Sequence, residues 1–185
     1  MPNDHTLSLS TVTATIHAPI EKVNIADWLF HLPDAEYQRC SQAHIAAGAT
    51  TSDDGDPMSI NVETIGDAFV VQHYVGEVRE PHFCRMVSIS DSISPAGRTK
   101  LKVIWELSAK KLDDLTCEFT NHIHSSAIGQ TLAFFRDHNV PFERAREARQ
   151  QASHAHNQEE TPNFAKSIER RALGLSNPLA NGEKQ

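Results

Sequence analysis

The feature that most constrains this fold is a period-two alternation of apolar and polar residues in the middle of the chain. It is clearest between residues 99 and 109, where leucine, valine and tryptophan alternate with lysine, glutamate and serine. Successive residues of a strand point to opposite faces of a sheet, so this pattern predicts a strand with one buried face. Short turns join most of these segments, which predicts an antiparallel meander. The other strand-like segments are residues 7–18, 58–65, 68–78, 83–93 and 115–125.

The lengths of the turns predict which residues of adjacent strands lie opposite each other. Gly66-Asp67 has glycine in the first position, as a two-residue type II′ turn requires. A three-residue turn at the next hairpin would pair His73 with Ile89. Five-residue turns at the two hairpins after that would pair Ile89 with Val103 and Val103 with Asn121. Directly opposed residues share a face, so one apolar face is predicted. Its members are Ile60, Val62, Phe69, Val71, His73, Val75, Val87, Ile89, Leu101, Val103, Trp105, Leu107, Cys117, Phe119 and Ile123.

Helical patterns flank the strand region. Short helices are predicted after Pro19 and over residues 34–44, and from residue 126 the apolar period becomes helical. Pro141 should kink the C-terminal helix or start a new one, and Thr161-Pro162 should begin a last short helix. The predicted fold class is therefore α+β, a curved antiparallel sheet of six to seven strands wrapped on a long C-terminal helix. Residues 1–158 would form the domain, and residues 159–185 a helical and partly disordered tail.

Composition excludes several kinds of partner. The 185 residues carry a formal net charge of −7, which argues against a nucleic-acid surface and, more weakly, against docking on anionic lipid. Three widely spaced cysteines without a C-x-x-C pair favour a reducing compartment. The N-terminus has no basic segment followed by an apolar run, and no stretch approaches the ~18 apolar residues of a membrane helix. We therefore expect a cytoplasmic protein with no membrane or nucleic-acid partner. A homodimer is possible.

One local motif resembles a known superfamily. The segment TVTATIHAPIEKV (residues 11–23) runs from a strand into Ala-Pro-x-x-x-Val. It resembles the first segment of SRPBCC proteins, which include START lipid-transfer domains, birch-pollen-allergen-like proteins and polyketide cyclases. The element order is also similar, over about residues 7–155. Two features differ, because the usual aromatic is displaced to Trp28 and Pro141 interrupts the last helix. The resemblance implies a helix-grip fold with a cavity between sheet and helix, but no particular activity, since such folds host transporters, cyclases and hydrolases.

Polar residues on the predicted apolar face are the candidate ligand contacts. A buried polar group without a partner costs roughly 1–3 kcal/mol. Glu77 and Arg85 would oppose and satisfy each other, whereas His73 and Asn121 either bond to neighbours, lie at the open rim or contact a ligand. Aromatic residues there are either core or ligand platform. The candidate ligand-binding residues are His73, Arg85, Trp105, Phe119, Asn121 and Phe135.

No motif predicts a metal or a cofactor. His122 and His124 share a strand face, but that face also carries threonine and glutamate and should be solvated. Three functions stay open. The first is a binding protein or carrier for a small hydrophobic or aromatic molecule. The second is a cyclase-, aromatase- or hydrolase-type enzyme that uses His73 as acid or base and Arg85 or Asn121 to polarise a carbonyl. The third is a vestigial cavity with the charged C-terminal arm as an interaction element.

Overall fold

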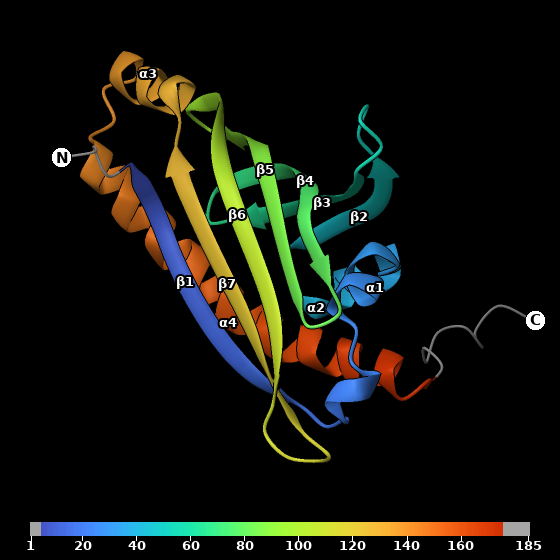
Figure 1. Cartoon of the computed structure of the whole chain (residues 1–185). Coiled ribbons are helices and arrows are strands. Elements are labelled where there is room, and N and C mark those ends of the chain that lie inside the picture. Colours follow the sequence, from blue (N-terminus) through green and yellow to red (C-terminus); the bar gives the residue numbers. More distant parts are fainter. Residues whose placement is uncertain (1–4, 176–185) are drawn as a thin grey trace, which may run out of the picture.

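Seven antiparallel strands form one sheet in the computed structural model, which describes residues 5–175 (Figure 1). Their order across the sheet is β1-β7-β6-β5-β4-β3-β2. The strands are β1 (Thr6–Ile16), β2 (His44–Thr51), β3 (Pro57–Ile65), β4 (Ala68–Glu80), β5 (Phe83–Ser94), β6 (Gly97–Lys111) and β7 (Cys117–Ala127). The helices are the 3-10 turn η1 (Ile20–Lys22), α1 (Ile25–Phe30), α2 (Asp34–Cys40), α3 (Gly129–Asp137) and α4 (Phe142–Ala172). The predicted fold class is confirmed. Strand β2, where the sequence indicated the end of a helix, was not predicted.

The long helix α4 lies along the sheet and covers the edge strand β1 (Figure 1). The amide of Leu9 donates to Gln150 Oε1 at 2.9 Å, and the Gln150 side chain donates to the Leu9 carbonyl at 3.0 Å. Nearer the other end of the helix, the amide of His17 donates to Glu169 Oε2 at 2.8 Å. An edge strand presents unpaired backbone groups, and here side chains of α4 satisfy several of them. The described residues include no helix with an apolar stretch long enough to cross a membrane.

Two prolines affect α4 differently. Pro141 precedes the first residue of the helix, so the predicted new start there is confirmed. Pro162 lies inside the helix, so the predicted start of a separate helix at Thr161-Pro162 is wrong. An internal proline costs about 3 kcal/mol or more, since it removes a hydrogen bond and crowds the preceding turn. Burial of Phe164 and Ile168, in the turns of the helix that follow Pro162, offsets that cost. The predicted domain boundary at residue 158 consequently falls within α4, and only residues 176–185 of the predicted tail lie outside the described part.

The core joins both ends of the chain to the sheet. Phe164 of α4 is fully buried, with its ring centre 5.2 Å from that of Trp28 in α1 and 6.1 Å from that of Trp105 in β6. The indole of Trp28 donates to Ser167 Oγ at 2.9 Å, which fixes α1 to the second half of α4. The C-terminal half of α4 is therefore part of the domain core.

The β3–β4 and β4–β5 hairpins keep the predicted register along most of their length. Ile65 pairs with Ala68 across Gly66, whose φ of 66° needs glycine, so this predicted turn is confirmed. Val75 pairs with Val87, as the predicted register requires. A bulge between Gly76 and Val78 shortens the predicted three-residue turn to two residues.

The β5–β6 hairpin corrects the predicted faces. Ser94 pairs with Gly97 across a two-residue turn, so Ile89 pairs with Lys102 rather than Val103. A one-residue slip moves every side chain to the other face. In the β6–β7 pair, Leu107 lies opposite Asn121, whereas the prediction placed Val103 there. This difference is an even number of residues, so the side chains of β6 and β7 keep their predicted faces. Thus the inward positions predicted for β6 and β7 are correct, but those for β3, β4 and β5 are wrong. The side chains buried on the helix side of these three strands are Ser59, Asn61, Glu63, Ile65, Ala68, Val70, Gln72, Tyr74, Cys84, Met86, Ser88, Ser90 and Ser92.

A buried carboxylate ties α2 to α4. Glu36 pairs with Arg39 and with Arg170. Burial opposes ionisation of Glu36, but hydrogen bonds from Arg39, Arg170 and Ser167 outweigh it and lower the pKa of Glu36 to about 2. The ionised carboxylate therefore stabilises the packing of α2 on α4.

Replacing Phe164 with alanine should lower the free energy of unfolding by about 3–5 kcal/mol, because the change leaves a cavity among buried rings. Denaturant titration followed by circular dichroism measures this. The control is Leu173→Ala, at a side chain that is 39% exposed, which should change stability by about 0.5 kcal/mol or less. Equal effects of the two variants would contradict the assignment of α4's second half to the core.

Glu36→Gln should reduce stability at neutral pH, and the loss should shrink as the pH falls from about 5 towards 2. The sign follows from the pKa of Glu36, which is lower in the folded than in the unfolded chain. Its stabilisation is thus present above the unfolded pKa and disappears on acidification. Thermal melts of both proteins across this range measure the effect, with exposed Asp54→Asn as the control. A difference independent of pH would show that the carboxylate charge is not what matters.

Candidate functional site

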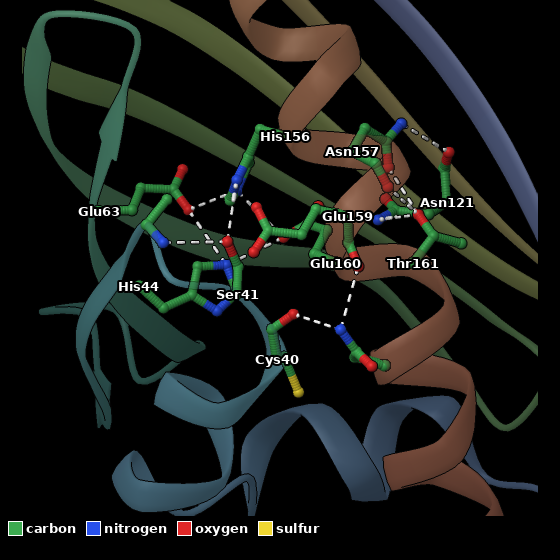
Figure 2. Close-up of polar contacts among 12 residues, drawn as sticks. Cys40, Ser41, His44, Glu63, Asn121, His156, Asn157, Glu159, Glu160 and Thr161 are labelled. Carbon is green, nitrogen blue, oxygen red and sulfur yellow. Dashed lines mark hydrogen bonds and ion pairs between the residues drawn. The ribbon is translucent and has the colours of Figure 1, made fainter.

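Four buried ionisable side chains converge between the sheet and α4 (Figure 2). His44 comes from β2, Glu63 from β3, and His156 and Glu160 from α4. The two helix residues are four apart, so they share one face of α4. His44 Nε2 lies 3.1 Å from Glu160 Oε2 and 3.6 Å from Glu63 Oε2. His156 Nε2 lies 3.1 Å from Glu63 Oε2 and 3.2 Å from Glu160 Oε2. We call these four residues the His-Glu cluster.

Tyr37 orients two members of the His-Glu cluster. Its carbonyl lies 2.7 Å from His44 Nδ1, and because a carbonyl only accepts, Nδ1 carries the hydrogen. The Tyr37 hydroxyl donates to Glu63 Oε2 at 3.0 Å, and its ring stacks on His44 with 3.8 Å between centres. Nε2 of His44 is thereby held towards both carboxylates.

Asn121 connects the cluster to the predicted aromatic platform. Its Oδ1 accepts from Trp105 Nε1 at 2.8 Å, and its Nδ2 donates to Glu160 Oε1 at 3.0 Å and to Thr161 Oγ1 at 3.2 Å. All of these groups are buried. Asn121 is therefore a satisfied core residue that positions Glu160.

Burial and neighbouring charges both shift the pKa values of these groups, and for His156 and Glu160 they act in opposite directions. Burial alone would lower the pKa of His156, but the carboxylates of Glu160 and Glu63 raise it well above its usual value. Burial would raise the pKa of Glu160, but charge and hydrogen bonds from His156 and His44 lower it. Burial and nearby carboxylates raise the pKa values of Tyr37 and Tyr74, so both phenols stay neutral. The cluster can thus hold positive charge at its centre.

A small cavity of about 20 Å³ lies beside the His-Glu cluster, which is room for about one water molecule. Its polar walls include Tyr74, Gln72 and Asn61 of the sheet, and Trp105 and Phe164 close it on the apolar side. This interior is too small for the predicted hydrophobic ligand.

A much larger open groove of about 730 Å³ adjoins this small cavity. Its walls are α3, the start of α4, and the tips of the β3–β4 and β5–β6 hairpins. Gly97, with a φ of 133°, allows one tip to approach α3, where an added Cβ would lie 3.1 Å from the Phe134 ring. Phe135 lines the groove, and Arg149 lines both this groove and the small cavity. We call this space the α3 groove.

The six sequence-predicted ligand residues fall in different places. Trp105 lines the small cavity, with Asn121 bonded behind it, and Phe135 lines the α3 groove. Phe119 is fully buried in the core.

The remaining two candidates lie on the outer face. His73, predicted inward, has a side chain 43% exposed and 3.4 Å from Asp91 Oδ2. Arg85 pairs with Glu106 and with Glu77, the latter at 3.0 Å. The prediction that His73 and Arg85 face the cavity is wrong, because of the register of the β5–β6 hairpin.

The His-Glu cluster was not predicted from the sequence. The spacing His156-x-x-x-Glu160 was visible and places both side chains on one helix face. Glu63 alternates with apolar Val62 and Ile60, so a hydrophobic pattern assigns it to the outer face. His44 lay in the strand that was not predicted. Only the correct strand register could have brought the four together.

Comparisons with known proteins identify the fold. No family model and no curated protein sequence matches the chain. A solved structure of the Zhui aromatase/cyclase from Streptomyces sp. R1128 is similar, with a TM-score of 0.64 and 13% identity over 91% of this chain and 98% of that one. A START superfamily protein from Mycobacterium smegmatis has a TM-score of 0.52 and 13% identity over 91% and 99%. A conserved protein from Geobacillus kaustophilus has a TM-score of 0.51 and 9% identity over 90% and 95%. The chain therefore shares the helix-grip fold of these solved structures.

Proposed function

We propose that the protein binds a small, largely apolar or aromatic molecule in the α3 groove, with an anionic or carbonyl oxygen of that molecule directed at Arg149. The observation that carries this proposal is the Arg149 Nε atom, which is buried without a hydrogen-bond partner in the structure. A buried unsatisfied donor costs roughly 1–3 kcal/mol, and a ligand oxygen would remove that cost.

The surroundings of Arg149 favour a ligand oxygen. Burial lowers the pKa of its guanidinium, and charge from Glu63 and Tyr74 only partly offsets this. An arginine stays protonated at neutral pH, so an incompletely compensated positive charge lies where the α3 groove meets the small cavity. A carboxylate, enolate or carbonyl oxygen would satisfy it.

The size and lining of the α3 groove fit a small molecule. Its volume lies within the ~300–1,000 Å³ typical of small-molecule sites. More of the lining residues are apolar than polar, and the polar side chains, among them Thr99 and Arg149, would orient a ligand. The apolar lining includes Leu7, Ile65, Ala68, Leu101, Phe134, Phe135, Val140, Ala145, Ala148 and Ala152.

The structural neighbours are compatible with this class of function. Their names describe an aromatase/cyclase and a START superfamily protein. Sequence identity this low supports only a shared fold, so the proposed class of ligand rests on the α3 groove and on Arg149. A cytoplasmic location and a homodimer remain expectations from the sequence.

The anionic dye 1-anilinonaphthalene-8-sulfonate combines aromatic rings with an anionic oxygen group, and it should bind the α3 groove. Arg149→Met keeps the length of the side chain and removes its charge. This variant should bind the dye about tenfold or more weakly, the size of one lost charge-assisted hydrogen bond. Fluorescence titration measures the dissociation constant. The neutral N-phenyl-1-naphthylamine should bind both proteins alike.

Matched controls separate the groove from the rest of the surface. Arg146→Met on the same helix removes an exposed charge outside the groove, so it should leave both dyes unaffected. His73→Leu, on the outer face, should also bind normally. Phe135→Ala should weaken both dyes by losing apolar contact. Equal dye affinities in wild type, Arg149→Met and Phe135→Ala would reject the α3 groove as the binding site.

A second candidate is a cyclase- or aromatase-type enzyme that acts in the α3 groove, where Arg149 would polarise a carbonyl oxygen of the substrate. The test is conversion of a poly-β-ketone thioester to a cyclic product, followed by liquid chromatography and mass spectrometry. Full activity in Arg149→Met would reject this role.

A further inference from the structure

We propose that the His-Glu cluster binds one divalent transition-metal ion, with zinc as the best fit. The ligand atoms are Nε2 of His44 and His156 and Oε2 of Glu63 and Glu160, and all four lie within 4.8 Å of one another. This site is separate from the α3 groove and does not depend on the ligand proposed there. Imidazole nitrogen and carboxylate oxygen are both common zinc ligands.

The distances between the ligand atoms match a metal-binding shell. Four histidine-to-carboxylate separations are 3.1, 3.6, 3.1 and 3.2 Å. Zinc–nitrogen and zinc–oxygen bonds of about 2.0–2.2 Å put neighbouring ligands of a tetrahedron roughly 3.4 Å apart. Each imidazole Nε2 lies 3.1 to 3.6 Å from a carboxylate oxygen of both Glu63 and Glu160 (Figure 2). The other two separations, between the two nitrogens and between the two oxygens, are at most 4.8 Å, and a bound ion would draw these atoms together.

The surrounding residues orient the ligands as metal sites require. The Nδ1–H of His44 donates to the Tyr37 carbonyl, which leaves Nε2 as the coordinating atom. Glu63 accepts from the Tyr37 hydroxyl, and Glu160 accepts from Asn121 through the oxygen that does not face the centre. These outer hydrogen bonds fix ring and carboxylate orientations before any ion binds. They also explain why Asn121 and Tyr37 are buried here.

Charge balance also favours a cation at this centre. Two carboxylates with two neutral imidazoles carry a charge of −2, which a divalent ion neutralises. Two protonated histidines would also neutralise it, so protons and metal compete for the same four atoms. The small cavity beside the cluster has room for one water molecule as a further ligand.

Zinc binding by the wild-type chain, prepared without an affinity tag, is the first test. Isothermal titration with Zn²⁺ alone should show one equivalent, and the melting temperature should rise with Zn²⁺ concentration because the ion binds the folded state. Folded protein that takes up no stoichiometric Zn²⁺, Co²⁺ or Mn²⁺ would overturn the proposal. X-ray absorption of the zinc-loaded protein should show two imidazole ligands at about 2.0–2.1 Å.

Variants on α4 and β3 assign the bound ion to the four residues. Glu63→Gln and His156→Gln should each weaken Zn²⁺ binding at least tenfold. The matched controls His154→Gln and Glu159→Gln change neighbouring residues of α4 that are outside the cluster, and should bind as wild type does. Undiminished binding in both cluster variants would refute the site. If those variants unfold, the X-ray absorption spectrum of the zinc-loaded wild-type protein is the test. A spectrum that shows bound zinc without imidazole ligands would contradict the proposal. Dye binding in the α3 groove is measured separately, so failure of either proposal is recognised independently.

Discussion

Burial of the second half of α4 is the constraint on which the rest of the structure depends. Phe164 and Ile168 lie in the turns of α4 that follow Pro162 and are buried in the core, where the Phe164 ring contacts Trp28 of α1 and Trp105 of the sheet. Their burial keeps the helix continuous across a residue that would otherwise end it. Continuity matters because His156 and Glu160 precede the proline. A helix that broke there would no longer hold these two side chains against β2 and β3.

The inner face of the sheet is polar at one end and apolar at the other, and this division determines where each kind of chemistry can occur. β6 and β7 contribute Trp105 and Phe119, which pack against α4. β3 and β4 instead contribute Glu63 and Gln72. A polar interior is stable only when its groups satisfy one another, and the bonds from Tyr37 and Asn121 do this for the cluster. The interior is therefore rigid and small, and the open volume lies outside it, under α3.

The fold could be predicted from the sequence because apolar–polar alternation and turn residues specify strands locally. The Gly66 turn and the inward side of β6 followed directly from these signals. The site could not be predicted, because it depends on the β5–β6 register and on an apolar outer face. Phe69, Ile89 and Ile93 are each about two-fifths exposed, so a rule that turns apolar residues inward assigns their strands to the wrong face. That error moved His73 into the cavity and left Glu63 outside it.

Arg149 relates the two proposed sites physically. Its side chain lines both the α3 groove and the small cavity, and it is close enough to Glu63 for that carboxylate to raise its pKa. A divalent ion that displaces fewer than two protons from the His-Glu cluster would add positive charge beside the carboxylate of Glu63, which now offsets the charge of Arg149. The positive potential facing the groove would then rise, and an anionic ligand would bind more tightly. Linkage requires the reverse as well, so an anionic ligand at Arg149 would strengthen metal binding by the same factor. Because both groups act through Glu63, Glu63→Gln should remove this coupling even where the groove itself stays intact.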